Sequence, residues 1–153
     1  RGSRIKDCIC LPSQLSRHDR KISGPIADRI DLWLNVPYLP PKQLTDQQIN
    51  NESSQQIAER VIRARQRQAE RYRQFNFKTN AELPAKLLNK FAPLTPSSQQ
   101  LLNQTASRLV LSARAYHRII KIARTIADLA DQESINDDHL LEAIQYRPKI
   151  NLA

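Results

Sequence analysis

The stretch LSARAYHRIIKIARTIADLADQESINDDHLLEAIQYR, residues 111–147, decides the fold class. Ser112 and Asn136 each stand directly before a run with helical periodicity, and both residue types are favoured helix N-caps. The pattern predicts two helices, 113–130 and 137–146, joined by a short loop. The inward face expected for the first helix carries five residues: Tyr116, Ile119, Ala123, Ile126 and Ala130.

The residues upstream of this stretch also predict helices. A helix is expected over 96–109 behind a Thr-Pro N-cap pair, with three inward side chains, and a short helix is expected over 84–91. A long helix is expected from Glu52 onward, with Asn51 or Ser53 as its N-cap. Two glycines in 153 residues also favour helices over a turn-rich all-β fold. The inward side chains of the 96–109 helix are expected to be Leu102, Ala106 and Leu109.

The first 40 residues differ in character from the rest. Residues 1–22 are polar and are predicted to be irregular, and residues 37–51, with three prolines at their start, are predicted to be a linker. Between these segments, apolar residues alternate with other residues over 30–36, which predicts one half-buried strand. We expect residues 1–40 to be less well packed than the helical bundle that follows.

Charge and cysteine content restrict the function classes. The net charge is +9, and the excess is largest over residues 52–92, with 9 basic and 4 acidic side chains. Such an excess favours nucleic acid, nucleotide phosphate or an acidic protein surface as a partner, although a solvated basic surface fits equally well. No apolar run approaches membrane-spanning length, and no signal-peptide pattern opens the chain. The Cys-x-Cys spacing disfavours a disulfide, so a reduced, cytoplasmic location is expected.

An arginine stripe is the first candidate binding surface. Its members are spaced 3, 4 and 4 residues apart and therefore share one side of the predicted long helix. Such a stripe could follow the phosphates of a nucleic-acid backbone without reading its sequence. The alternative is a solvated helix face that is partly paired with Glu59 and Glu70. The stripe consists of Arg60, Arg63, Arg67 and Arg71.

Arg114 is the second candidate. It lies in the first turn after the Ser112 cap, and it shares a side with Arg118 and Lys121, within about 60° at 100° per residue. A guanidinium that projects from a helix end suits a bidentate contact with phosphate. An ordinary exposed basic face is the alternative.

Metal and catalytic motifs are weak. Cys8 and Cys10 could supply two thiolates to zinc, but two ligands are too few, and His18 is the nearest further candidate. The sequence contains no GxxxxGK[ST] phosphate loop and no nucleophile–base arrangement. We therefore expect no catalysis from these residues alone.

Two stretches resemble one family. SGPIADRIDLWLNVP, residues 23–37, resembles the SGP-x-x-DRID block that closes the ATPase core in the magnesium-chelatase-like branch of AAA+ proteins. Residues 111–147, with SARAYHR, ARTIADLA and EAIQYR in order, resemble the C-terminal lid of that branch. The competence-associated ComM type is the most similar, and the resemblance covers residues 8–147.

The resemblance implies a mainly α fold, namely an AAA+ C-terminal helical lid bundle preceded by the last strand and linker of a truncated P-loop αβ core. It divides the chain into a core remnant over 1–40, an arginine-rich helical linker over 41–92, the lid bundle over 93–147 and a tail over 148–153. The phosphate loop would lie before Arg1, so the chain is expected to be a C-terminal piece of a longer ATPase.

The resemblance also implies roles for particular residues. Arg29, in DRID, corresponds to an arginine finger that acts in trans on a neighbour's ATP, and Arg114 corresponds to the sensor-2 arginine that contacts nucleotide phosphate. Cys8 and Cys10 match the second half of a four-cysteine knuckle, so zinc is possible in addition to the ATP and Mg²⁺ of the parent protein. The implied partners are ATP, DNA and further copies in a ring, with no membrane contact.

Three functions follow from these patterns. The first is nucleotide sensing and communication between ring subunits in a DNA-processing, helicase-like motor of natural transformation. The second is a stand-alone nucleic-acid-binding helical module that uses the arginine stripe. The third is a subunit of a magnesium-insertion chaperone, against which the arginine-rich, ComM-like blocks argue.

Overall fold

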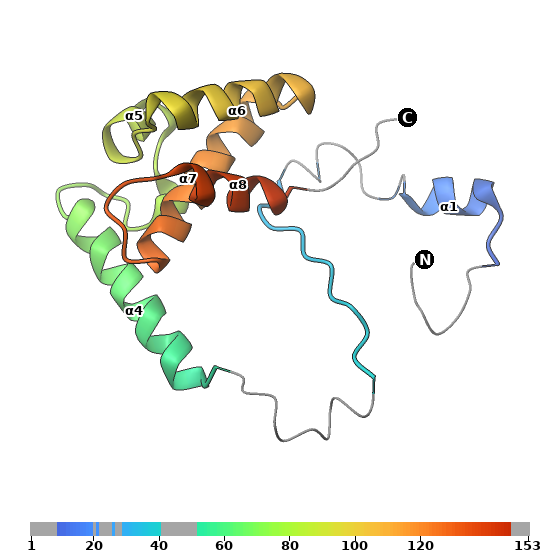
Figure 1. The fold of residues 1–153 in the computed structure, drawn as a ribbon, viewed down its shortest axis with the longest axis horizontal. Coiled ribbons are helices and arrows are strands. Elements are labelled where there is room, and N and C mark those ends of the chain that lie inside the picture. The colour runs from blue at the N-terminus through green and yellow to red at the C-terminus, as the bar shows by residue number, and fades with distance from the viewer. Residues whose placement is uncertain (1–8, 20, 22–25, 27–28, 41–51, 148–153) are drawn as a thin grey trace. The chain divides into compact units, whose positions relative to one another are not determined.

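The structure is a computed structural model, and it describes residues 9–19, 21, 26, 29–40 and 52–147 (Figure 1). Contacts divide the chain into two compact units, Arg1–Asn51 and Glu52–Ala153. The division into four segments that the resemblance implies stays a prediction.

Residues Pro12–Asp19 of the first unit form the α-helix α1. The prediction that residues 1–22 are irregular is therefore wrong for this segment. The physical reason lies in two local features. Pro12 fits the first position of a helix, where its missing N–H is not needed. The side-chain oxygen of Gln14 accepts a hydrogen bond from the Leu11 backbone N–H at 3.0 Å.

The strand predicted over 30–36 is also wrong for this chain. Residues 30–40 have no regular secondary structure, and no strand occurs in the described part of the chain. A strand needs a hydrogen-bonded neighbour, and an apolar alternation alone does not supply one. The apolar side chains of the segment are accordingly exposed, from Ile30 at 37% to Val36 at 83%.

The second unit is helical, as predicted. Its helices appear in Figure 1 in green to red, in the order of the chain. They are α4 (Ser54–Arg71), the 3₁₀ turns η1 (Asn80–Glu82) and η2 (Ala85–Leu87), α5 (Leu88–Phe91), α6 (Pro96–Arg108), α7 (Ala113–Leu129) and α8 (Asp137–Gln145).

Side-chain caps begin four of these helices. In each case the N-cap oxygen accepts a hydrogen bond from the backbone N–H three residues later, which satisfies one of the donors left open at a helix start. The predicted caps of α6, α7 and α8 are confirmed, and Ser53 rather than Asn51 caps α4. The four N-caps are Ser53, Thr95, Ser112 and Asn136.

The ends of α6 and α7 share an unusual backbone feature. Val110 and Asp131, which follow the two C-caps, have positive φ angles of 48° and 61°. The residue after each closes a Schellman-type bond, from Leu111 N–H to Ala106 O at 3.0 Å and from Gln132 N–H to the α7 backbone at 2.8 Å. Glycine is the usual residue at such positions, and this chain uses a valine and an aspartate instead.

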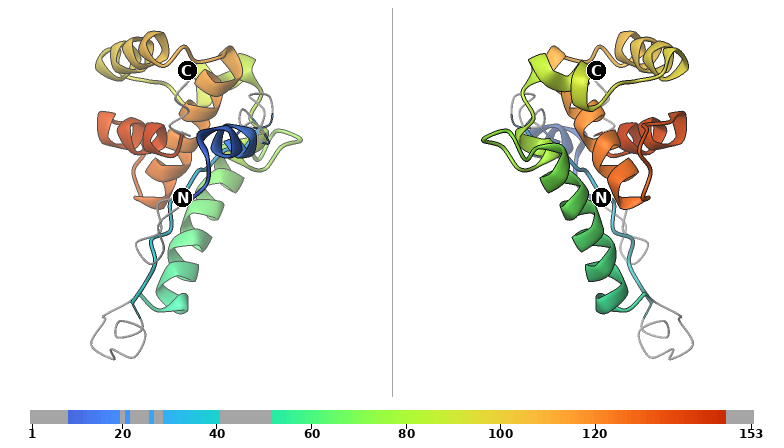
Figure 2. Two further views of the ribbon diagram at one scale, coloured as in Figure 1. Left: turned by 90° about the vertical axis from the view of Figure 1, so that its right-hand side faces the viewer. Right: turned by 90° about the vertical axis from the view of Figure 1, so that its left-hand side faces the viewer.

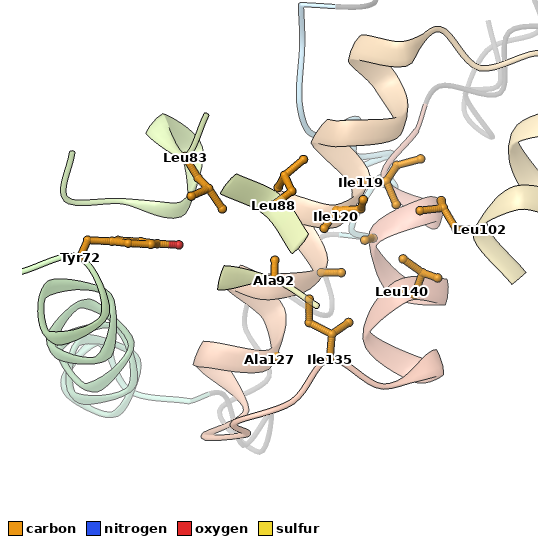
Figure 3. Close-up of a cluster of buried hydrophobic side chains, with 12 residues drawn as sticks. Tyr72, Leu83, Leu88, Ala92, Leu102, Ile119, Ile120, Ala127, Ile135 and Leu140 are labelled. Atoms are coloured by element: carbon orange, nitrogen blue, oxygen red, sulfur yellow. The ribbon is translucent and has the colours of Figure 1, made fainter. Parts of the chain in front are cut away.

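The core of the unit lies around α7, which packs against α8, α4, η1 and α5. Figure 3 shows the side chains of Leu102, Ile119 and Leu140 where α6, α7 and α8 meet. Two predicted inward residues are wrong. Leu109 is 46% exposed and Ala130 is also exposed, because both are C-cap residues at which the chain leaves the helix. The buried cluster comprises Tyr72, Leu83, Leu88, Ala92, Leu102, Ile119, Ile120, Ala123, Ala127, Ile135, Leu140 and Ala143.

Candidate functional site

Arg114 lies where the sequence predicted, in the first turn of α7, and its side chain is exposed. The Ser112 hydroxyl accepts from the Ala115 backbone N–H at 3.1 Å and so fixes the start of the helix. Ala115 and Ile119 are fully buried and hold α7 in the core. The start of a 17-residue helix carries partial positive charge and open N–H donors, which attract anions. The guanidinium and the helix end therefore both add positive potential to this part of the surface.

The two other cations on this side of α7 are less open than Arg114. Arg118 and Lys121 are both half-buried. Lys121 Nζ donates a hydrogen bond to the Ala81 backbone carbonyl at 2.9 Å, so it joins α7 to η1. On this side of α7, Arg114 is thus exposed to solvent, whereas Lys121 is held against η1.

Arg29 belongs to the first unit. Its backbone N–H donates to the Ile26 carbonyl at 2.9 Å, which closes a turn, and its side chain is exposed. Of the cysteine pair, Cys10 is exposed and Cys8 lies outside the described residues. The structure therefore describes half of the predicted metal-binding pair.

The arginine stripe divides into different environments. Arg60 forms two hydrogen bonds with the Glu52 carboxylate, at 2.8 and 3.0 Å, near the start of α4. Arg63 is exposed. Arg67 pairs with Asp131 at 2.5 Å and Arg71 with Asp128 at 2.5 Å, and both carboxylates belong to the C-terminal end of α7 and the turn after it. The C-terminal half of the arginine stripe, Arg67 and Arg71, thus joins α4 to α7 and to the turn after it.

Sequence analysis missed a buried ionic network around Asp128. The Asp128 carboxylate accepts hydrogen bonds from Arg71 at 2.8 and 2.5 Å and from Asn80 Nδ2 at 2.8 Å, and it forms an ion pair with Arg124 at 3.1 Å. Asp128, Asn80 and Arg124 are all at least 98% buried. The Tyr72 hydroxyl donates to Asn80 Oδ1 at 2.8 Å and so extends the network.

Arg124 connects this network to the turn between α7 and α8. Its guanidinium donates to the backbone carbonyls of Glu133 at 2.5 Å and Gln132 at 2.7 Å. One signal could have revealed the network, because Asp128 is the first acidic residue after Glu82 and lies four residues after Arg124 within an apolar helix. Charges at such positions are buried only when they are paired.

Opposing effects set the ionisation of this network. Burial raises the pKa of Asp128, but hydrogen bonds from Arg71 and Asn80 and the charges of both arginines outweigh it and hold that pKa below its usual value. Burial lowers the pKa of Arg124, and the charge of Asp128 opposes that effect. Asp128 is therefore held as a carboxylate between two guanidinium groups.

The described residues contain no group of three or more His, Cys, Asp or Glu side chains placed to hold a metal ion. No helix among them is long and apolar enough to cross a bilayer.

Comparison with protein families identifies the helical unit. The family described as magnesium chelatase, subunit ChlI C-terminal, matches residues 51–147. The chain belongs to this family. A second magnesium chelatase match, subunit ChlI, covers residues 1–44, which include the SGPIADRID block. The magnesium-chelatase resemblance is thus confirmed, and the mainly helical class is confirmed with it; the truncated P-loop core is a prediction.

Curated relatives of this magnesium chelatase chain come from several bacteria. Competence protein ComM of Haemophilus influenzae is 39% identical over 141 residues, which cover 92% of this chain and 27% of the relative. Uncharacterized protein YifB of Salmonella typhimurium is 39% identical over 90% of this chain and 26% of its own length. An uncharacterized protein of Mycobacterium bovis is 34% identical over 93% of this chain and 28% of its own length. The chain therefore spans about a quarter of these relatives and corresponds to the C-terminal region of a magnesium-chelatase-like protein.

Proposed function

We propose that the helical unit is the nucleotide-sensing lid of an AAA+ ATPase, in which Arg114 contacts a phosphate of bound nucleotide. The supporting observation is the position of Arg114, exposed in the first turn of a helix whose core face is fully packed. No acidic residue occurs between Glu82 and Asp128, so no carboxylate from α5, α6 or the start of α7 competes for this guanidinium. A rigid helix that presents one open cation suits a sensor of phosphate charge.

The residues of this chain fit one part of a nucleotide site. The 153 residues include two glycines and no phosphate loop, so they cannot cradle a triphosphate by backbone N–H groups. When bound, ATP with Mg²⁺ would supply the phosphoryl group that is transferred to water. This chain would contribute the Arg114 contact in one subunit and the Arg29 guanidinium at a neighbour's site, where added positive charge stabilises the transferring group.

We further propose that the assembled ring acts on DNA. Support comes from the name of the Haemophilus influenzae relative, a competence protein, and from the net charge of +9. Within the arginine stripe, Arg63 has the exposure that a phosphate contact needs, whereas Arg60 pairs with Glu52 and Arg71 with Asp128. The magnesium-insertion alternative is supported by the description of the matching families, and no contact among the described residues adds to that support.

A chimera tests the lid assignment. Residues 1–147 would replace the aligned C-terminal region of the Haemophilus influenzae relative, and the dissociation constant of a fluorescent ATP analogue would be measured together with ATP hydrolysis. A charge-assisted contact is worth about 1.5–3 kcal/mol, so Arg114→Ala should weaken binding by about tenfold or more.

Arg108→Ala is the matched control, because Arg108 is another exposed arginine at the end of a neighbouring helix. It should leave the dissociation constant unchanged. Equal affinities for the Arg114→Ala and unsubstituted chimeras would refute the sensor role. A chimera that binds no ATP although the natural relative does would refute the lid assignment itself.

A further inference from the structure

One side of α4 is covered over its second half and open over its first. The residues of this side are spaced 4, 3 and 4 apart, which is the spacing of a seam between packed helices. Ala64 and Gln68 in the second half are 3% exposed. Ile57 and Val61 in the first half are 42% and 43% exposed. We call these four residues the α4 seam.

The fold explains why the seam is open at one end. The C-terminal end of α4 lies against α7 and η1, and its N-terminal end extends away from α6, α7 and α8 (Figures 1 and 2). Among the described residues of the second unit, no other helix lies beside the first two turns of α4 in these views. Ile57 and Val61 thus continue the α4 seam beyond the part that is buried next to α7.

Arginines border the α4 seam on one side, and their side-chain exposure also increases from the covered end to the open end. Arg71, Arg67 and Arg60 lie about 40–80° from Ile57 at 100° per residue. Their side chains are 18%, 35% and 41% exposed from the covered end to the open end. The first two pair with Asp128 and Asp131, the carboxylates of the element that covers the seam.

Arg60, at the open end, is held differently. Its partner Glu52 lies eight residues earlier, just outside the helix, and both side chains are largely exposed, at 41% and 54%. An exposed pair of this kind contributes little and is readily exchanged for a carboxylate on another molecule. The open end therefore places two apolar side chains beside an arginine whose carboxylate partner is replaceable, whereas the arginines beside the covered end are paired with carboxylates of the packed neighbour.

We propose that the first half of α4 docks an acidic amphipathic helix of a partner protein. The apolar side chains of the partner helix cover Ile57 and Val61. Its carboxylates replace Glu52 as the ion-pair partner of Arg60. The covered half of α4 is the template, because α7 packs on it and Asp128 of α7 and Asp131 of the following turn pair with its flanking arginines. A nucleic-acid backbone fits less well, since phosphates gain nothing from an apolar seam. This interaction is independent of the nucleotide contact proposed for Arg114.

Synthetic helices provide the probe. A labelled peptide of about 21 residues, with Leu at positions a and d and Glu at e and g, would be titrated with the whole chain at low salt and followed by fluorescence anisotropy. We expect saturable binding that Ile57→Ser and Arg60→Ala each weaken by about fivefold or more. The same peptide with Lys at e and g should not bind.

Two residues of the same helix serve as matched controls. Ile62, 54% exposed, and the exposed Arg63 point about 120–140° away from Ile57. Ile62→Ser and Arg63→Ala should therefore leave binding within about twofold, whereas losses equal to those of Ile57→Ser and Arg60→Ala would overturn the proposal.

Two further outcomes would overturn it. One is no saturable binding of the Glu peptide at about 1 mM protein. The other is tight binding of a short DNA duplex that depends equally on Arg60 and Arg63 and is unaffected by Ile57→Ser, which would assign the surface to nucleic acid. All substituted side chains are exposed, and circular dichroism would verify that each variant keeps the helical fold.

Discussion

Asp128→Asn is the change that most severely tests the packing of α4 against α7. Three hydrogen bonds converge on the Asp128 carboxylate, two from Arg71 and one from Asn80, and Arg124 adds an ion pair. Asparagine has nearly the same shape, so the change leaves packing intact. It removes the negative charge and turns one oxygen acceptor into an NH₂ donor that faces other donors.

The expected loss of stability is large. Arg124 is 2% exposed and keeps its charge after the substitution, and Arg71 is mostly buried beside it. Removing one member of a buried ion pair costs about 3–5 kcal/mol, because the remaining charge is desolvated and unpaired. Small domains are stable by about 5–15 kcal/mol, so the variant should lose a large fraction of its unfolding free energy. The corresponding drop in Tm is about 12–40 °C at 4–8 °C per kcal/mol.

Urea denaturation followed by circular dichroism measures this loss, since the unit is helical. Asp131→Asn is the matched control, because Asp131 pairs with Arg67 on the surface, is 65% exposed, and tolerates asparagine at its positive φ of 61°. That control should cost no more than about 1 kcal/mol. A loss below about 1 kcal/mol for Asp128→Asn would refute the conclusion that this network joins the helices.

Three smaller predictions concern pH, backbone strain and capping. Because the folded state holds the pKa of Asp128 below its usual value, its stabilisation is present above the unfolded pKa of about 3.9 and is lost as the pH falls further. Acid titration of the unfolding free energy should therefore be steeper for the natural chain than for Asp128→Asn, and equal slopes would contradict this reasoning. Val110→Gly should raise stability by about 1 kcal/mol in thermal melts, since a β-branched residue is strained at φ 48°; a destabilised variant would show that the strain is absent. Asn136→Ala should cost about 0.5–2 kcal/mol in urea, because the side chain accepts from the His139 N–H at 3.0 Å, and an unchanged midpoint would argue against the cap.

Local sequence rules predicted the helices well, because the relevant interactions span three or four residues. Ser112 and Asn136 were placed as N-caps from residue type and position, and both accept the expected backbone hydrogen bond. The periodicity of residues 113–130 likewise predicted that Ile119 and Ala123 are buried. Helical periodicity does not show where a helix ends, however. It therefore did not predict that the chain leaves the helix at Leu109 and that this side chain is exposed.

Interactions between distant residues could not be predicted in this way. The alternation over 30–36 specifies two faces of a strand but not the neighbour that would pair with it. The arginine stripe was predicted as one surface, yet Arg71 meets Asp128, 57 residues later in the chain. No spacing rule connects positions so far apart. Of the candidate site, Arg114 was predicted as an exposed cation from its position after a cap, while the buried network that holds α4 in place was missed.

The most direct test of the account is the hydrolysis rate of the Arg29→Ala chimera. If Arg29 acts on the ATP of a neighbouring subunit, hydrolysis should fall by about 10³-fold while the dissociation constant for ATP stays within about twofold. Arg17→Ala, an exposed arginine of α1, should change neither quantity. A rate within about twofold of the unsubstituted chimera would contradict the assignment of this chain to a ring ATPase with a trans-acting arginine.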